Sequence, residues 1–260
     1  MKKQHENYQE LIWRLAKTDF KLRYQGSILG YFWALLKPML TFTVLYFVFS
    51  SIFNPRNSDG VSTYSLELLV GILMYSFFAE GTGAGLSSLM SKAQLVTKIY
   101  VPRWTIILAA TINSAMIYSM NLLIIVALFA IKGFLPEWQA VALFFLFSFF
   151  IYILIVSFSF IAAPLFVKFR DLSMIWEVLL MIIMYASPII YPLVTLPAKY
   201  HQLILLNPVA FIVHFTKESL IHAHYADPSQ YLIFIIMLIA FFVSSIFIYQ
   251  KMIKRVAENM

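Results

Sequence analysis

Long apolar stretches separated by short polar gaps make up most of the chain beyond residue 27. A transmembrane helix needs about 20 consecutive, mostly apolar residues, and six stretches come close to that length. We place the spans at roughly 30–53, 64–90, 104–131, 139–166, 173–192 and 230–250. The pattern predicts an all-α membrane protein, with one transmembrane domain of about six helices covering residues 28–260.

The polar segment 1–27 has a helical pattern of its own. Apolar residues recur there at helical spacing while basic residues occupy the other side, and the apolar set is Tyr8, Leu11, Ile12 and Leu15. This predicts a cytoplasmic amphipathic helix that lies in the membrane interface. A solvated helix or a disordered tail is the alternative. The segment is too polar to be the apolar core of a signal peptide.

The region 193–229 is too polar and too often interrupted by proline for a regular span, although 203–221 is mostly apolar. Irregular backbone at membrane depth is tolerated only where protein or water satisfies its polar groups. We therefore predict short re-entrant helices that dip into the outer leaflet between spans five and six. A seventh span is the alternative, and it would place the basic C-terminal tail outside.

Lysine and arginine are distributed unequally between the two sides of this topology. With the N-terminus in the cytoplasm, all but four of the 19 basic side chains lie on the cytoplasmic side. The four on the outer side are Arg56, Lys132, Lys199 and Lys217. Because cytoplasmic loops of membrane proteins are enriched in basic residues, we expect both chain ends in the cytoplasm and an even number of spans.

The composition agrees with a membrane protein. Hydrophobic residues make up 62% of the chain and charged residues 12%, whereas soluble domains are about half apolar and about a quarter charged. The net charge of +7 follows the predicted topology rather than forming a soluble basic patch, so we expect no nucleic-acid partner. The absence of cysteine excludes disulfides and thiolate chemistry.

Few residues are candidates for catalysis or cofactor binding. A P-loop requires a Gly-Lys pair followed by Ser or Thr, and Gly-Lys does not occur in the chain. His222 and His224 form an HxH pair without an evident third ligand, so we expect no metal site. No Ser/His/Asp set can be assigned either. We expect that the chain is not an enzyme, has no catalytic residues and binds no cofactor itself.

Glu80 lies near the middle of span two. A charge at that depth costs about 2.5–3.5 kcal/mol on insertion scales, so Glu80 should face a partner or a wet cavity. It could be a gate or conduit residue, or a hydrogen-bonded packing residue. Lys37, near the start of span one, should reach the cytoplasmic edge or line a mouth there. Gly81 and Gly85 have the GxxxG spacing that lets helices approach closely.

Aromatic residues make up 17% of the chain. Several tyrosines, including Tyr46 and Tyr185, lie deep within predicted spans. Aromatic faces stack on apolar surfaces while the tyrosine hydroxyl forms hydrogen bonds, so a conduit for glycans would use such residues. Packing against helices or lipid is the alternative for each of them.

Four segments together are typical of one transporter family. They are RYQGSILGYFWALLKP at 23–38, QLVTKIYVPRW at 94–104, FVKFRDL at 166–172, and SPIIYP at 187–192 with Asn-Pro at 207–208. In order and spacing the chain resembles the permease subunit of the ABC exporters of cell-surface polysaccharides, which are O-antigen, capsule and teichoic acid. Lys37 departs from the neutral residue usual before that proline, and Lys217 stands where the family often has arginine.

The resemblance implies a permease that works as a dimer with two copies of a separate ATPase, which binds ATP and Mg. The cargo would be a polyprenyl-linked glycan crossing the cytoplasmic (inner) membrane, with spans one and five lining the conduit. The implied contacts with the ATPase are Leu95, Lys98, Pro102, Arg103, Phe169, Arg170 and Asp171. The expected conduit or gate residues are Gly30, Trp33, Lys37, Tyr46, Glu80 and Tyr185.

Three other functions remain open from the sequence. A drug or lipid exporter would share this architecture. A membrane-embedded glycosyltransferase would need clustered acidic residues near one membrane face, and Asp171 beside Arg170 is the only compact charged feature. An ATP-independent channel or secondary transporter would carry several charges at mid-membrane depth, where Glu80 is nearly alone.

Overall fold

The computed structural model describes residues 8–53, 63–93 and 101–256, with side chains to residue 253. Every regular element in this part of the chain is helical, which confirms the predicted all-α class. The elements are α1 (Tyr8–Arg23), α2 (Phe32–Phe53), α3 (Tyr64–Ser91), α5 (Arg103–Lys132), α6 (Trp138–Lys168), α7 (Leu172–Ala186), the 3-10 turns η1 (Leu193–Thr195) and η2 (Ala198–Tyr200), α8 (His201–Leu205), α9 (Pro208–His222) and α10 (Pro228–Val256).

Five of the described helices are long and apolar enough to cross a membrane, namely α2, α3, α5, α6 and α10. The ends of α2, α3, α5 and α6 agree with the predicted spans to within two residues, whereas α10 continues to Val256, past the predicted end at residue 250. The agreement arises because the length of an apolar stretch is a property that the sequence displays directly.

Helix α7 is shorter than the fifth predicted span, 173–192, because it ends at Ala186. Ser187 has extended backbone angles, φ −105° and ψ 148°. The ring of a following proline, here Pro188, disfavours the helical conformation for the residue before it. The 15 residues of α7 correspond to about 22 Å at 1.5 Å per residue, less than the ~30 Å of a hydrocarbon core.

Helices α8 and α9 form a pair bent by 113°, as expected for short helices in the region 193–229. Asn207 lies at the bend and caps the N-terminus of α9, because its side-chain oxygen accepts a hydrogen bond from the backbone N–H of Val209 at 3.0 Å. Pro208 occupies the first helical position, where its missing N–H costs nothing. Helix α9 packs against α3 and α6. Which leaflet holds this pair stays a prediction.

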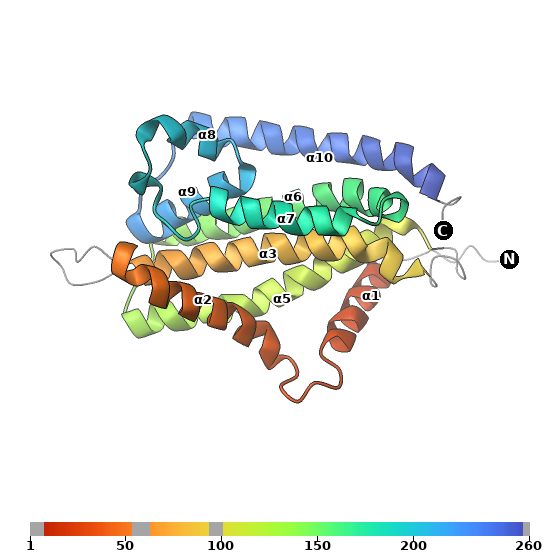
Figure 1. Ribbon diagram of the computed structural model, residues 1–260, viewed down its shortest axis with the longest axis horizontal. Helices are drawn as coiled ribbons and strands as arrows, with labels where there is room; N and C mark the ends of the chain where they lie inside the picture. Colours follow the sequence, from red (N-terminus) through yellow and green to blue (C-terminus); the bar gives the residue numbers. More distant parts are fainter. Residues whose placement is uncertain (1–7, 54–62, 94–100, 257–260) are drawn as a thin grey trace.

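Helix α3 lies at the centre of the helix bundle and contacts α5, α6, α2 and α9 (Figure 1). Helix α10 packs against α6. The beginning of α1 and the end of α10 lie at one end of the molecule (Figure 1), where Arg103 donates a hydrogen bond to the carbonyl of Ile253. We call this the terminal end. The opposite end, where His222 contacts Glu67, is the distal end.

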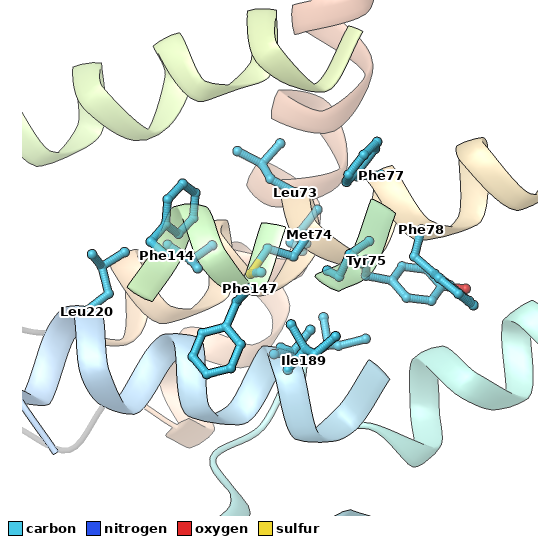
Figure 2. Close-up of a cluster of buried hydrophobic side chains, with 14 of the residues drawn as sticks. Leu73, Met74, Tyr75, Phe77, Phe78, Phe144, Phe147, Ile189 and Leu220 are labelled. Atoms are coloured by element: carbon cyan, nitrogen blue, oxygen red, sulfur yellow. The ribbon is translucent and has the colours of Figure 1, made fainter. Parts of the chain in front are cut away.

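A cluster of buried apolar side chains joins α3 to α6 and to the distal elements. Met74 from α3 lies beside Phe147 from α6, and Leu73, Phe77, Ile189 and Leu220 belong to the same cluster (Figure 2). Helices in lipid associate through close packing rather than through the hydrophobic effect. The core is therefore held by shape complementarity.

Gly81 and Gly85 lie where α3 approaches α6 closely. A Cβ atom at Gly81 would lie 2.6 Å from Cδ1 of Ile155, and one at Gly85 would collide with the Ser159 side chain. The close helix approach predicted from the GxxxG spacing is confirmed.

Helix α1 packs on the first turns of α5. Ile12 and Ala16 are buried against Ala109, and Nδ2 of Asn113 donates a hydrogen bond to the carbonyl of Ala16 at 3.2 Å. The predicted N-terminal helix is confirmed, and part of its apolar face packs on protein. Its position in a membrane interface stays a prediction.

Candidate functional site

A cavity of about 700 Å³, lined by both polar and apolar side chains, lies between α1, α2, α3 and α5, and we call it the α1–α3 cavity. Each of the four helices, or the turn that follows it, contributes polar side chains to the lining. Among them are Arg23, Tyr24, Trp33, Lys37, Thr41, Tyr75, Ser76, Glu80, Ser87 and Asn121. The cavity therefore brings together Trp33, Lys37 and Glu80, three of the residues expected at a conduit or gate.

Glu80 forms an ion pair with Arg23, the last residue of α1. Glu80 lies eleven residues before Ser91, the end of α3, which is about 16 Å along a helix. A carboxylate at that depth needs a counter-charge or water, and Arg23 supplies the counter-charge at the edge of the α1–α3 cavity. The expectation that Glu80 faces a partner or a wet cavity agrees with this geometry, while its role as a gate stays a prediction.

The α1–α3 cavity holds more positive than negative charge. Lys37 has no ion-pair partner within the described part of the chain, and it lines the cavity beside the Arg23–Glu80 pair. Asn121 is 5% exposed, and its side-chain oxygen has no hydrogen-bond partner among the described residues. Such a group is uncommon, because buried polar atoms are nearly always paired.

A second ion pair holds the last turns of α1 against the terminal end of α3. Nζ of Lys92 lies 2.6 Å from Oδ2 of Asp19. Asp19 and Arg23 are four residues apart, so they project from the same side of α1. The two pairs have opposite polarity, since α1 supplies the carboxylate in one and the cation in the other. Together they position Arg23 at the cavity.

Two tyrosines complete the cavity wall. The hydroxyl of Tyr75 donates a hydrogen bond to the carbonyl of Leu180 at 2.6 Å, which ties α3 to α7. Tyr24 lies in the turn after α1, and burial raises the pKa of its hydroxyl above the usual value. Tyr24 therefore stays neutral and is able to donate a hydrogen bond into the cavity.

The residues expected to contact an ATPase lie in two connections. Leu95 and Lys98 fall outside the described residues. Pro102 is the residue immediately before α5, and its carbonyl accepts a hydrogen bond from the N–H of Thr105 at 3.0 Å. Arg103 donates to the carbonyl of Ile253 at 3.1 Å. Within the described part of this connection, Arg103 therefore fastens α5 to α10.

Phe169, Arg170 and Asp171 form the connection from α6 to α7 at the terminal end. All three are exposed, and Phe169 is 54% exposed although it is aromatic. Arg170 and Asp171 have no ion pair with any described residue. These side chains are accessible to another protein, and their coupling role stays a prediction.

Three of the expected conduit residues lie outside the α1–α3 cavity lining. Gly30 has φ +50° in the turn before α2, a conformation that glycine adopts without strain. Tyr46 is half-buried and stacks on Phe42 and Tyr64, with ring centroids 5.6 and 6.3 Å apart. Tyr185 is 62% exposed near the end of α7. Tyr46 therefore packs within the chain, whereas Tyr185 has no aromatic stacking partner among the described residues.

Sequence reasoning did not assign Arg23, Tyr75 or Asn121 to this site. Asn121 gave a signal, because an amide within an apolar span needs a partner. Arg23 gave none, because its contact with Glu80 depends on how α1 folds back toward α3. Tyr75 is one of the tyrosines that lie deep within the predicted spans, but its partner on α7 was not predicted.

Lys217 has a defined structural role near the distal end. Its ammonium group donates hydrogen bonds to the carbonyls of Pro188 and Ile189, at 2.7 and 2.9 Å. These carbonyls lie just after the end of α7, where no following helical turn supplies N–H donors for them. Gly71 allows this approach, because a Cβ there would lie 3.0 Å from Cε of Lys217.

The two histidines of the HxH pair have separate carboxylate partners. Nε2 of His222 lies 3.1 Å from Oε1 of Glu67, and Nδ1 of His224 lies 3.4 Å from Oε2 of Glu218. In the described segments no three His, Cys, Asp or Glu side chains are grouped as metal ligands. His222 therefore links the end of α9 to Glu67 of α3, and His224, two residues past that end, contacts Glu218 of α9 itself.

Residues 10–221 match the family described as ABC-2 type transporter. The chain belongs to this family. Two O-antigen export system permease proteins RfbA of Klebsiella pneumoniae are similar to it. They are 25% and 26% identical, over 80% and 78% of this chain and 79% and 77% of theirs. A protein of the same name from Myxococcus xanthus is 25% identical over 92% of both chains.

The family resemblance deduced from the four sequence segments is thus confirmed. As an ABC-2 type transporter permease, the chain is a multi-pass membrane protein and the transmembrane subunit, without an ATPase domain. Permeases of this family pair with ATPase subunits, which bind the ATP. The α1–α3 cavity and the exposed connection before α7 thus belong to the membrane half of an ATP-driven transporter.

Proposed function

We propose that the chain is the permease of an exporter that moves a lipid-linked polysaccharide outward across the cytoplasmic membrane. O-antigen, teichoic acid and capsule belong to this cargo class. The observation that carries the proposal is similarity to an O-antigen export permease over 92% of both chains. Similarity of this extent includes the spans, the connections and the re-entrant pair.

Two copies of the permease pair with two copies of an ATPase that binds ATP and Mg. The ATPase docks at the terminal end, with both ends of the permease chain in the cytoplasm. Exposed Phe169, Arg170 and Asp171 support this assignment. The Lys92–Asp19 ion pair beside the other connection supports a route from that docking surface to α1.

The conduit lies along α2 and α7, where two copies of the chain face each other. Helix α7 has no buried residue, and Met174 and Met181 are 71% and 62% exposed. On α2, Phe47 is 84% exposed. Apolar faces of this kind accommodate a lipid tail or a second subunit. The cargo is a polyprenyl-linked glycan.

The test combines co-purification with depletion. A tagged chain is extracted from its membrane in mild detergent, and an ATPase is expected to co-purify in equal amount. Depletion of the chain is then expected to remove a glycan from the cell surface. An unchanged surface glycan in depleted cells contradicts the polysaccharide assignment. A stable chain that never co-purifies with an ATPase contradicts the exporter assignment as a whole.

A further inference from the structure

We propose that Lys37 of one copy of the chain forms an ion pair with Glu177 of the partner subunit, and that two such pairs join each α2 to the partner's α7. The inference rests on the proposed function for the presence of a dimer. It deepens that function, because it names charged residues that hold the two copies together along the conduit.

Helices α2 and α7 each carry one charged side chain in an otherwise uncharged sequence. Lys37 is the charged residue of α2, and Glu177 is the charged residue of α7. Both side chains are exposed. Neither forms an ion pair with any residue in the described part of the chain. Charged residues within membrane-spanning segments nearly always pair with one another or face water, so each of these two lacks a partner that the other can supply.

Glu177 lies on the exposed side of α7. Met174 and Met181, three residues before it and four residues after it, are on the same helix face and are largely exposed. The indole of Trp176, by contrast, stacks on Phe158 of α6 with ring centroids 3.9 Å apart. The carboxylate of Glu177 is therefore presented away from its own bundle, together with an apolar stripe.

Lys37 lies on a corresponding stripe of α2. Trp33 and Leu40, four residues before it and three residues after it, share its helix face and are 43% and 52% exposed. Lys37 also borders the α1–α3 cavity, where the carboxylate of the lining is Glu80. Because Glu80 already pairs with Arg23, the ammonium group of Lys37 remains available to another carboxylate.

The two charges lie at a similar depth in the bundle. Lys37 borders a cavity whose α3 lining falls within residues 75–87. Nε1 of Trp176, the residue before Glu177, donates a hydrogen bond to Oγ1 of Thr82 at 3.1 Å, in the middle of that stretch. Both charges are thus level with the same part of α3.

Helices α2 and α7 also run in the same direction, toward the distal end. Phe53, the last residue of α2, packs on Tyr64 with ring centroids 6.0 Å apart. The hydroxyl of Tyr64 donates a hydrogen bond at 2.9 Å to the carbonyl of Ile190, four residues beyond α7. A two-fold axis along the membrane normal keeps both directions and depths. The same contact then forms twice, as in any isologous interface.

The ion pair should determine register more than affinity. Removal of two charges from water offsets most of their mutual attraction, whereas loss of one partner leaves the other charge unpaired at membrane depth. Reversal of one charge is worse, because it places like charges side by side. Single substitutions should therefore weaken the dimer, and a simultaneous exchange of both charges should be tolerated.

Cross-linking in membranes tests the contact directly. The chain has no cysteine, so cross-links report only on introduced positions. Full-length copies that carry Lys37→Cys and Glu177→Cys, each with its own tag, are expressed together and treated with a short bifunctional thiol reagent. Both tags are expected in one band of dimer size. When Lys199→Cys, past the end of α7, replaces Lys37→Cys, no such band is expected.

A single chain that carries both Lys37→Cys and Glu177→Cys reports on the opposite arrangement. Cross-linking of this chain without a doubling of its mass would show that the two positions meet within one copy, and the inference would be wrong. Leu40→Cys with Met181→Cys, about one helical turn farther along, tests the α2–α7 seam without its charges. A dimer band is expected for this pair as well.

Exchange of the charges tests the ion pair itself. Lys37→Glu and Glu177→Lys, each alone, should weaken dimerisation of the full-length chain in detergent at least about tenfold. The double variant should recover to within about threefold of wild type, because the opposite charges face each other again. Lys199→Glu reverses a cation outside α2 and should dimerise as wild type does. If the double variant dimerises no better than the single variants, the ion pair does not form.

Failure of the inference is distinguishable from failure of the proposed function. A dimer band for Leu40→Cys with Met181→Cys, but none for Lys37→Cys with Glu177→Cys, overturns the ion pair and retains the seam. No dimer band for either combination overturns the inference as a whole. Neither result affects the export function, which is tested by co-purification of an ATPase and by surface glycan. Conversely, intact cross-links and charge rescue support the ion pair even if surface glycan is unchanged by depletion.

Discussion

Arg23 at the end of α1 forms an ion pair with Glu80, which lies well inside the central helix α3. The pair makes the N-terminal helix part of the wall of a cavity within the transmembrane domain. A movement of α1 therefore changes the distance between the Arg23 guanidinium and the Glu80 carboxylate, and with it the electrostatic stabilisation of that carboxylate.

The Arg23–Glu80 pair should contribute little to stability. The two side chains are 41% and 27% exposed, and ion pairs with such exposure are worth at most about 1 kcal/mol. In a double-mutant cycle with Arg23→Gln and Glu80→Gln, we expect a coupling free energy below that value, smaller still at high salt. Thermal unfolding of the four proteins in detergent measures it. A coupling of several kcal/mol would mean that the pair is a structural brace.

The glycines of α3 should differ sharply in their tolerance of alanine. Gly85→Ala drives a methyl group into Ser159, and overpacking of this kind costs about 1–3 kcal/mol. Gly83→Ala is the matched control, because nothing lies within 4 Å of a Cβ there. Alanine at that position should be neutral or stabilising, since it is a better helix former by about 1 kcal/mol. Equal unfolding temperatures for the two variants would contradict the described contact between α3 and α6.

Lys217→Met should destabilise the junction after α7. The change removes both hydrogen bonds to Pro188 and Ile189 and leaves buried carbonyls unpaired, at about 1–3 kcal/mol each. Limited proteolysis is expected to cut within 187–200 earlier than in wild type. Lys199→Met is the control, because the interaction of Lys199 with the described residues is a cation–π contact with Tyr200 at 4.8 Å. Indistinguishable cleavage of the two variants would show that the ammonium does not hold the junction.

Charge reversal at the α6–α7 connection tests coupling to the ATPase. Arg170→Glu and Asp171→Lys change exposed side chains without ion-pair partners in the described chain, so insertion and abundance should be normal. We expect at least about a tenfold loss of surface glycan, because such a change juxtaposes like charges at the docking surface. Lys132→Glu at the distal end of α5 is the control. Normal export by both variants would exclude this connection as a coupling element.

The sequence predicted those features that depend on local pattern. Span bounds follow from apolar length, and the approach of α3 to α6 follows from Gly81 and Gly85. The early end of α7 was also encoded locally, because Ser187 precedes a proline, but the apolar character of 188–190 concealed it. By contrast, the Arg23–Glu80 and Lys217–Ile189 contacts join segments 28 residues or more apart. They depend on how helices pack, which single residues do not display.

Tyr46 and Tyr185 should respond differently to alanine, although both were expected at a conduit. Tyr46 stacks on Phe42 and Tyr64, so Tyr46→Ala should lower the free energy of unfolding by about 1–3 kcal/mol. Tyr185 is 62% exposed on α7, so its removal should leave stability within about 0.5 kcal/mol of wild type. If α7 lines the conduit, Tyr185→Ala should nevertheless slow glycan export. Unfolding temperature and surface glycan, measured on the same preparations at matched abundance, separate the two effects. Full export by Tyr185→Ala would remove this side chain from the conduit.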